Sequence, residues 1–157
     1  MPVIVIGADT ALGEYAIDEL SRHNRDIRAF VSDPTVGAGL RNRGIRVAVG
    51  DVSDGSHLGG AAAGCFSAIL VPEAAFDGRL RSFADSPAAT VSIWASAVDE
   101  ASVQRLILLE DGRIPDASER FAGVEAEIVV IPTERRSPTD IAIDVSKADN
   151  LDSLPEV

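Results

Sequence analysis

The sequence predicts a doubly wound α/β fold. It consists of one domain of three layers, with a parallel sheet in strand order 3-2-1-4-5-6 between two layers of helices. Short continuous runs of Val, Ile and Leu recur along the 157 residues, as in strands that are buried on both faces. Segments with helical periodicity separate these runs, and a turn containing glycine follows the first run directly. Alternation of this kind with right-handed crossovers favours the stated strand order.

Six apolar runs supply the predicted strands. They are Val3–Ile6, Ile27–Val31, Val47–Val49, Ala68–Val71, Leu106–Leu109 and Ile128–Ile131. Leu12, Ala16 and Leu20 share one face of the first predicted helix. Capping residues, two of them followed by proline at the first helical position, predict where the later helices start: Asp33-Pro34, Ser53 or Asp54, Ser86-Pro87 and Asp116.

The C-terminal part of the chain differs in pattern from the rest. We therefore predict a core domain over residues 1–134 and a C-terminal extension over residues 135–157. Alternating apolar residues between Ile141 and Val145 predict a short, half-exposed strand in this extension. The polar stretch Ser146–Val157 is predicted to be a mobile tail.

Composition and charge exclude several classes of protein. With 25 acidic and 14 basic residues the net charge is −11, and such an acidic surface repels a phosphate backbone, so we expect no nucleic-acid partner. No apolar run approaches the roughly 20 residues of a membrane helix, so we expect no membrane partner. The first strand begins without the basic flank of a secretory signal, and Cys65 is the only cysteine. Both observations favour a cytoplasmic protein.

The stretch Gly7–Gly13 lies between the first strand and the first helix. Glycine at its two ends permits a tight turn and close packing of the helix against the strand. The first amides of the helix then point toward an anion such as a pyrophosphate. The position of the turn, directly after the first strand of an alternating pattern, therefore predicts a phosphate-binding loop.

Three segments together resemble a known family. They are Val3-Ile4-Val5-Ile6-Gly7-Ala8 followed by Gly13, Arg28-Ala29-Phe30-Val31-Ser32-Asp33-Pro34, and Val49-Gly50-Asp51-Val52-Ser53-Asp54. Their order and spacing are similar to those of the atypical short-chain dehydrogenases/reductases. The group they resemble most is the NmrA-like one, whose members bind NAD(P) on a Rossmann fold. The resemblance extends from about Val3 to Ile131.

This resemblance implies a cofactor site at the carboxyl edge of the sheet. The residues implied at the pyrophosphate are Gly7, Asp9, Thr10, Ala11, Leu12 and Gly13. Those implied elsewhere are Ser32 and Asp33 by the adenosine ribose, Asp51 and Val52 by the adenine, and Val71 and Pro72 beside the nicotinamide-side ribose.

Two departures from the family pattern bear on the cofactor. The family loop reads G-x-x-G-x-x-G, and Thr10 occupies the middle glycine, where its Cβ and hydroxyl crowd a phosphate although the hydroxyl can also donate to it. Ser32 stands where NADP-preferring members often carry arginine, and Asp33 would repel a 2′-phosphate. We therefore expect NAD rather than NADP, with binding that is weak or has been lost.

The catalytic pair of the family is missing. Its dehydrogenases use Tyr-x-x-x-Lys, in which the lysine lowers the pKa of the tyrosine, whereas the only tyrosine here is Tyr15 and the only lysine is Lys147. We therefore expect no catalytic residues and a dinucleotide-binding sensor or regulatory module. Two alternatives stay open. One is a small NAD(P)-dependent oxidoreductase whose cofactor does the chemistry, and the other is a partner-binding domain with a decayed cofactor site.

The histidines and the cysteine give no site of their own. His23 and His57 have no metal-ligand spacing, so we expect no metal site. Cys65 follows Gly64 just before a predicted strand and is expected to be a small buried hydrophobic residue.

Two further features concern the surface of the predicted domain. Four acidic residues follow the fourth and fifth strands, where α/β folds place their ligands: Glu73, Asp77, Glu110 and Asp111. Glu110 and Asp111 predict either a paired-carboxylate site or, as part of this set, a solvated acidic rim. Val91, Trp94 and Val98 form an apolar stripe that predicts a homodimer through their helix, although part of the stripe must cover the sheet.

Overall fold

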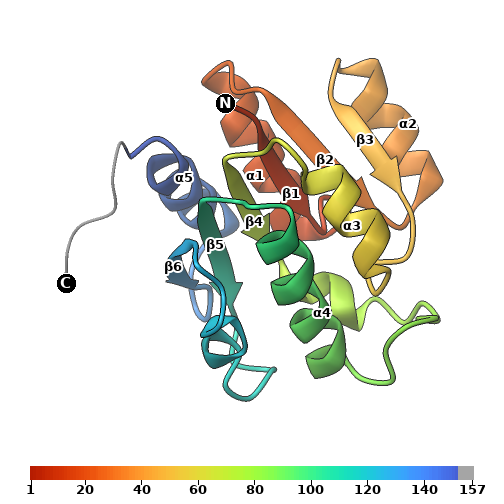
Figure 1. The fold of residues 1–157 in the computed structure, drawn as a ribbon. Coiled ribbons are helices and arrows are strands. Elements are labelled where there is room, and N and C mark those ends of the chain that lie inside the picture. The colour runs from red at the N-terminus through yellow and green to blue at the C-terminus, as the bar shows by residue number, and fades with distance from the viewer. Residues whose placement is uncertain (152–157) are drawn as a thin grey trace.

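The sheet has the predicted topology. The computed structural model describes residues 1–151. Its six strands pair in parallel in the order β3-β2-β1-β4-β5-β6 (Figure 1). They are β1 (Val3–Ile6), β2 (Ile27–Val31), β3 (Arg46–Val49), β4 (Ser67–Leu70), β5 (Arg105–Glu110) and β6 (Glu127–Pro132). The prediction of a single α/β domain with this strand order is confirmed.

Helices cover both faces of the sheet. They are α1 (Ala11–Arg22), α2 (Pro34–Asn42), α3 (Gly55–Ala62), α4 (Pro87–Glu100) and α5 (Pro138–Asp149), with short 3-10 helices η1 (Pro72–Phe76) and η2 (Ser118–Phe121). In Figure 1, α3 and α4 lie on the face toward the viewer, and α1, α2 and α5 pack on the other. Within residues 1–151, no helix combines the length and the apolar character that crossing a membrane demands.

Strand β1 shows why the strands read as continuous apolar runs. Val3 and Val5 belong to the core under α1, α2 and α5, whereas Ile4 and Ile6 belong to the core under α3 and α4. None of the four is more than 1% exposed. Because successive side chains on a strand face opposite sides, a strand between two helical layers needs apolar residues at every position.

Side chains cap most of the predicted helix starts. Asp33 and Ser86 each accept a hydrogen bond from a backbone amide in the first turn, at 2.8 Å and 3.1 Å. Of Ser53 and Asp54, the cap of α3 is Asp54. The predicted cap at Asp116 is wrong, because this residue adopts a positive φ of 54° in the preceding turn and η2 has no side-chain cap.

The predicted strand between Ile141 and Val145 is wrong, because this segment lies in α5. Ser137 caps the helix and Pro138 takes its first position, which is the same signal that predicts α4. Ile141 and Val145 are four residues apart, so they share the buried face of a helix that packs against α1. The predicted mobile tail begins inside α5, and residues 152–157 lie outside the described part of the chain.

The apolar stripe of α4 is used within the chain. Val91, Trp94 and Val98 are each 0% exposed and belong to the core of this domain. The indole N–H of Trp94 donates to the carbonyl oxygen of Val52 at 2.7 Å. These three side chains are therefore not available to a partner, and the homodimer through α4 stays a prediction.

Candidate functional site

The turn between β1 and α1 is built around two glycines. Gly7 has a φ of +92°, which glycine adopts without strain, and its amide donates to the carbonyl of Phe30 in β2 at 3.1 Å. A Cβ on Gly13 would lie 2.8 Å from the Cα of Ala8 and closer still to the carbonyl oxygen of Gly7. Glycine at position 13 therefore lets α1 begin directly against the turn, as a phosphate-binding loop requires.

Thr10 is the N-cap of α1. Its hydroxyl donates to the carbonyl of Gly7 at 2.6 Å and accepts from the amide of Gly13 at 3.0 Å. The hydroxyl is therefore engaged inside the turn rather than directed at a ligand. The signal for this role is present in the sequence, since threonine directly precedes the first helical residue. The weak dinucleotide affinity predicted from Thr10 stays a prediction.

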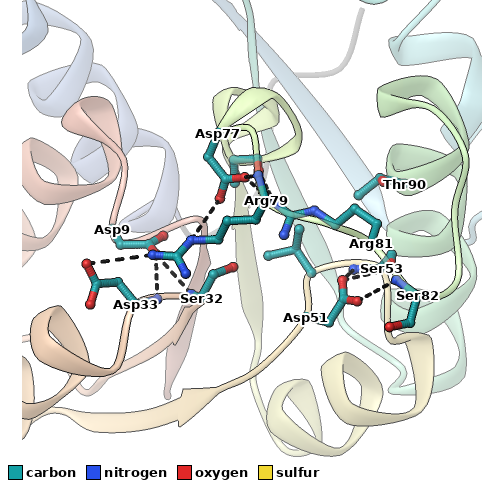
Figure 2. Close-up of polar contacts among 12 residues, drawn as sticks. Asp9, Ser32, Asp33, Asp51, Ser53, Asp77, Arg79, Arg81, Ser82 and Thr90 are labelled. Carbon is teal, nitrogen blue, oxygen red and sulfur yellow. Dashed lines mark hydrogen bonds and ion pairs between the residues drawn. The ribbon is translucent and has the colours of Figure 1, made fainter.

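Asp9 ties the end of β2 to the β1–α1 turn. Its carboxylate accepts from the amides of Ser32 and Asp33, at 2.9 Å and 3.1 Å (Figure 2). The hydroxyl of Ser32 is buried and has no hydrogen-bond partner within residues 1–151. A buried hydroxyl without a partner costs about 1–3 kcal/mol. A ligand hydroxyl that paired with Ser32 would recover this free energy once the groups that cover the Ser32 oxygen had moved aside. The site lies where the resemblance implies a ribose.

Asp51, at the end of β3, holds two other segments in place. Its carboxylate accepts from the amide and hydroxyl of Ser53, at 2.8 Å and 2.7 Å, and from the amide of Ser82 at 2.8 Å. Burial raises the pKa of Asp51, but these hydrogen bonds and the nearby Arg81 guanidinium outweigh it and hold the pKa below its ordinary value of 3.8. The Asp51 carboxylate is therefore ionised at neutral pH, with both oxygens already engaged.

This geometry makes the contribution of Asp51 to the free energy of unfolding dependent on pH. We expect Asp51→Asn to lower the free energy of unfolding by about 1 kcal/mol at neutral pH, because an amide replaces a carboxylate that accepts three hydrogen bonds. A lowered pKa stabilises the fold above the ordinary value, and this stabilisation is lost as the pH falls through the folded-state pKa. The difference from wild type should therefore shrink below about pH 4.

Thermal melts of both proteins between about pH 3 and pH 7 measure this dependence. Asp85→Asn is the matched control, because it removes an exposed carboxylate that makes none of these contacts. A stability difference for Asp51→Asn that stayed constant across the whole range would contradict the assignment.

The remaining predicted cofactor residues lie around the same edge and have apolar side chains. Val52 and Val71 are 0% exposed, and Pro72 is buried. Ala11 and Leu12 are the first residues of α1. The structure therefore brings the predicted residues to one edge of the sheet, where these five offer packing and backbone groups rather than polar side chains.

A segment that follows β4 crosses this edge. We call residues 72–83 the strap, which comprises η1 and the loop after it. From the strap, Arg79 extends to the end of β2, where its Nη2 lies 3.8 Å from Oδ2 of Asp33 (Figure 2). Asp77 orders the strap itself, since its Oδ1 accepts from the guanidinium of Arg81 at 2.6 Å. Local sequence patterns give no signal for the contact of Arg79 with Asp33, because these residues are far apart in the chain.

Glu73 connects the strap to α1. Its Oε1 accepts from the backbone amide of Ala11 at 3.0 Å. Ala11 is the first helical residue, so its amide has no partner within the helix. Glu73 therefore occupies one of the groups that the resemblance implies for the pyrophosphate.

A cavity of about 330 Å³ lies between the β1–α1 turn and the strap. Its charged lining consists of four carboxylates and two guanidinium groups: Asp9, Asp33, Glu73, Asp77, Arg79 and Arg113. At neutral pH the formal charges leave an excess of two negative charges. The cavity as the structure has it therefore opposes the entry of an anion.

Comparisons with known proteins identify the fold. Searches with family models and among curated proteins found no match. ChuY from Escherichia coli, an Anaerobillin reductase, has a TM-score of 0.76 at 12% identity, covering 98% of this chain and 92% of that chain. A Rossmann-fold NAD(P)-binding family protein from Shigella flexneri has a TM-score of 0.66 at 15% identity, covering 95% of this chain and 86% of that chain. This chain has the Rossmann fold of the NAD(P)-binding proteins.

A longer Rossmann protein is also similar. The triphenylmethane reductase of Citrobacter sp., complexed with NADP(H), has a TM-score of 0.68 at 19% identity. The match covers 83% of this Rossmann chain and 48% of the reductase, so the present chain spans about half of its length. The fold that the resemblance to atypical short-chain dehydrogenases implies is confirmed by these structures.

The other candidate residues of this Rossmann domain have structural partners. His23 pairs with Glu19 on α1 at 3.2 Å, and the His57 ring packs edge-on against Phe30. Cys65 is buried and burial raises the pKa of its thiol, which confirms the prediction of a small buried residue. No group of three or more potential metal ligands occurs in the described part of the chain.

The residues considered for catalysis lie on different elements of the Rossmann domain. Tyr15 is on α1, and Lys147 is in the last turn of α5. Glu110 ends β5, and the neighbouring Asp111 is paired with Arg113 at 2.7 Å. An arginine therefore engages one member of the predicted Glu110 and Asp111 carboxylate pair.

Proposed function

We propose that this Rossmann protein binds a nicotinamide dinucleotide, NAD in preference to NADP, and acts as a sensor or regulatory module. The β1–α1 turn carries the proposal, because Gly7 and Gly13 bring the start of α1 to the carboxyl edge of the sheet. The unpartnered hydroxyl of Ser32 supplies a second point of fit. Solved structures described as NAD(P)-binding or as complexed with NADP(H) support the choice of ligand.

The places of the residues at the edge suggest how each part of the dinucleotide would be held. The turn Gly7–Gly13 and the first amides of α1 would bind the pyrophosphate. Ser32 and Asp33 would hold the adenosine ribose, and the end of β3 at Asp51 would face the adenine. The bound nicotinamide would supply hydride chemistry, and its ribose would lie by Val71. The absence of a Tyr-x-x-x-Lys pair from the sequence favours sensing over catalysis.

Two carboxylates support NAD over NADP. Asp9 and Asp33 both lie at the proposed ribose position, and a 2′-phosphate would add about two negative charges beside them. The nearby guanidinium of Arg79 is already shared between Asp33 and Asp77, at 3.8 Å and 3.7 Å. We expect NAD to bind at least about tenfold more tightly than NADP. Ser32→Arg should move the preference toward NADP by adding a cation.

Calorimetric titration with NAD, NADH, NADP and NADPH tests the proposal, followed by thermal shift with the same ligands. Equal or tighter binding of NADP would contradict the assigned roles of Asp9 and Asp33. If none of the four ligands binds, the protein is better described as a partner-binding domain whose cofactor site has decayed.

A small NAD(P)-dependent oxidoreductase is the second candidate. It is favoured by the similarity to ChuY, an Anaerobillin reductase that this chain covers over 92% of its length. ChuY therefore shows that a protein of about this length and with this fold is described as a reductase. Oxidation of NADH or NADPH on addition of Anaerobillin or a triphenylmethane dye would support this candidate. Dinucleotide binding without oxidation would favour the sensor.

A further inference from the structure

The strap places a carboxylate where the proposed ligand carries a phosphate. Glu73 Oε1 accepts from the amide of Ala11 at 3.0 Å. The amides at the N-terminus of a helix carry a partial positive charge, which stabilises either a carboxylate or a phosphate. Both anions would use the same amide hydrogen, so Glu73 and a pyrophosphate cannot occupy it together.

The strap also contacts the two other positions of the proposed site (Figure 2). At the ribose position, the guanidinium of Arg79 lies 3.8 Å from the carboxylate of Asp33. At the adenine position, Asp51 accepts from the amide of Ser82 at 2.8 Å. One continuous segment therefore makes a polar contact at each of the three positions. The hydroxyl of Ser32 stays without a partner in this arrangement.

The two ends of the strap are held differently. Pro72 and Ala74 in η1 are buried in the domain, so Glu73 can leave the α1 amide by rotating its side chain alone. Leu80 and Phe83 are 98% and 62% exposed, so the second half is held by polar contacts and little apolar burial. Segments of that kind open at low free-energy cost compared with the core.

We propose that the strap is an intramolecular competitor of the dinucleotide, in which the Glu73 carboxylate stands in for a phosphate. This inference rests on the proposed function. Ligand binding requires Glu73 to release the α1 amide and the second half of the strap to leave the ends of β2 and β3. The affinity of the protein for NAD is therefore set in part by contacts within its own chain.

The variant Glu73→Gln tests this competition. It keeps the shape of the side chain and removes the charge from both the helix N-terminus and the acidic cavity. We expect NAD to bind about tenfold more tightly to Glu73→Gln than to wild type, while the melting temperature without ligand falls. The matched control is Glu14→Gln, which removes the same charge from an exposed position in the first turn of α1. The control should change the affinity by no more than about twofold.

Hydrogen exchange supplies a second readout. The amides of Ser82 and Phe83 donate to Asp51 and Ser53 when the strap is closed. Addition of NAD should therefore accelerate exchange at these two amides, whereas a strap that closes over the ligand would slow it.

The outcomes separate the two proposals. If wild type binds NAD and Glu73→Gln binds it no more tightly, the competition is overturned and the proposed function stands. An equal gain in Glu14→Gln would also overturn it, because general charge would explain the result. If neither wild type nor Glu73→Gln binds any dinucleotide, the proposed function fails and the competition fails with it. Binding of NAD by Glu73→Gln alone would support the competition and would show a dinucleotide site that Glu73 blocks in the wild type, rather than a site that has decayed.

Discussion

Gly13→Ala is expected to lower the free energy of unfolding by about 3 kcal/mol or more, since overpacking against fixed atoms lies at the upper end of such effects. The added Cβ would lie 2.8 Å from the Cα of Ala8 and closer still to the carbonyl oxygen of Gly7. Both neighbours are backbone atoms of the β1–α1 turn, so neither can rotate away. The turn would have to open, and dinucleotide binding should be lost with it.

Thermal or urea unfolding measures this effect, with an expected fall in melting temperature of about 6–12 °C. Gly39→Ala makes the same chemical change in α2, where an added Cβ meets nothing within 4 Å. This control should leave stability unchanged or raise it by up to about 1 kcal/mol, because alanine is the better helix former. Similar losses in both variants would refute the steric explanation.

Arg105→Leu is expected to destabilise the protein by about 3–5 kcal/mol. Arg105 begins β5 and is 0% exposed. Its guanidinium donates to the carbonyl oxygens of Ala148 and Leu151, at 2.9 Å and 2.6 Å, and stacks on the ring of Phe66. Leucine fills much of the space but leaves the end of α5 without these donors. Most of the loss comes from the carbonyl of Ala148, which is buried in the last turn of α5 and would lose its partner.

The control for Arg105→Leu is Glu127→Gln. Glu127 lies 3.4 Å from the guanidinium, and its side chain is 48% exposed. An ion pair with one solvated partner contributes little, so the control should change the free energy of unfolding by less than about 1 kcal/mol. Chemical denaturation of the three proteins decides the matter. A loss of stability in Glu127→Gln as large as in Arg105→Leu would show that Arg105 stabilises the protein through the ion pair and not through the end of α5.

Much of the fold could be predicted because its causes are local or periodic. Continuous apolar runs mark strands between two helical layers, and side-chain caps such as Asp33 and Ser86 mark helix starts. The error at α5 came from giving weight to alternation at Ile141 and Val145. The Ser137 cap and the i, i+4 spacing are equally present in the sequence and correspond to the helix that forms.

The site was predictable only in part. The turn at Gly7 follows from a local rule, since its position after β1 and its residue type are both visible in the sequence. The strap is different in kind. Ala11 and Glu73 are 62 positions apart, and their contact depends on where η1 places a side chain after the whole sheet has formed. Charge patterns along the chain therefore show an acidic rim but not which carboxylate meets which amide.

The position of Trp94 has an optical consequence. It is the only tryptophan of the chain, and its indole N–H is bound to the carbonyl of Val52, directly after Asp51. The tryptophan fluorescence of the protein therefore comes from a single side chain, which lies beneath the end of β3. A change at the strap or at the adenine position alters the surroundings of a single fluorophore. Energy transfer from this indole to a reduced nicotinamide would report occupancy without a label.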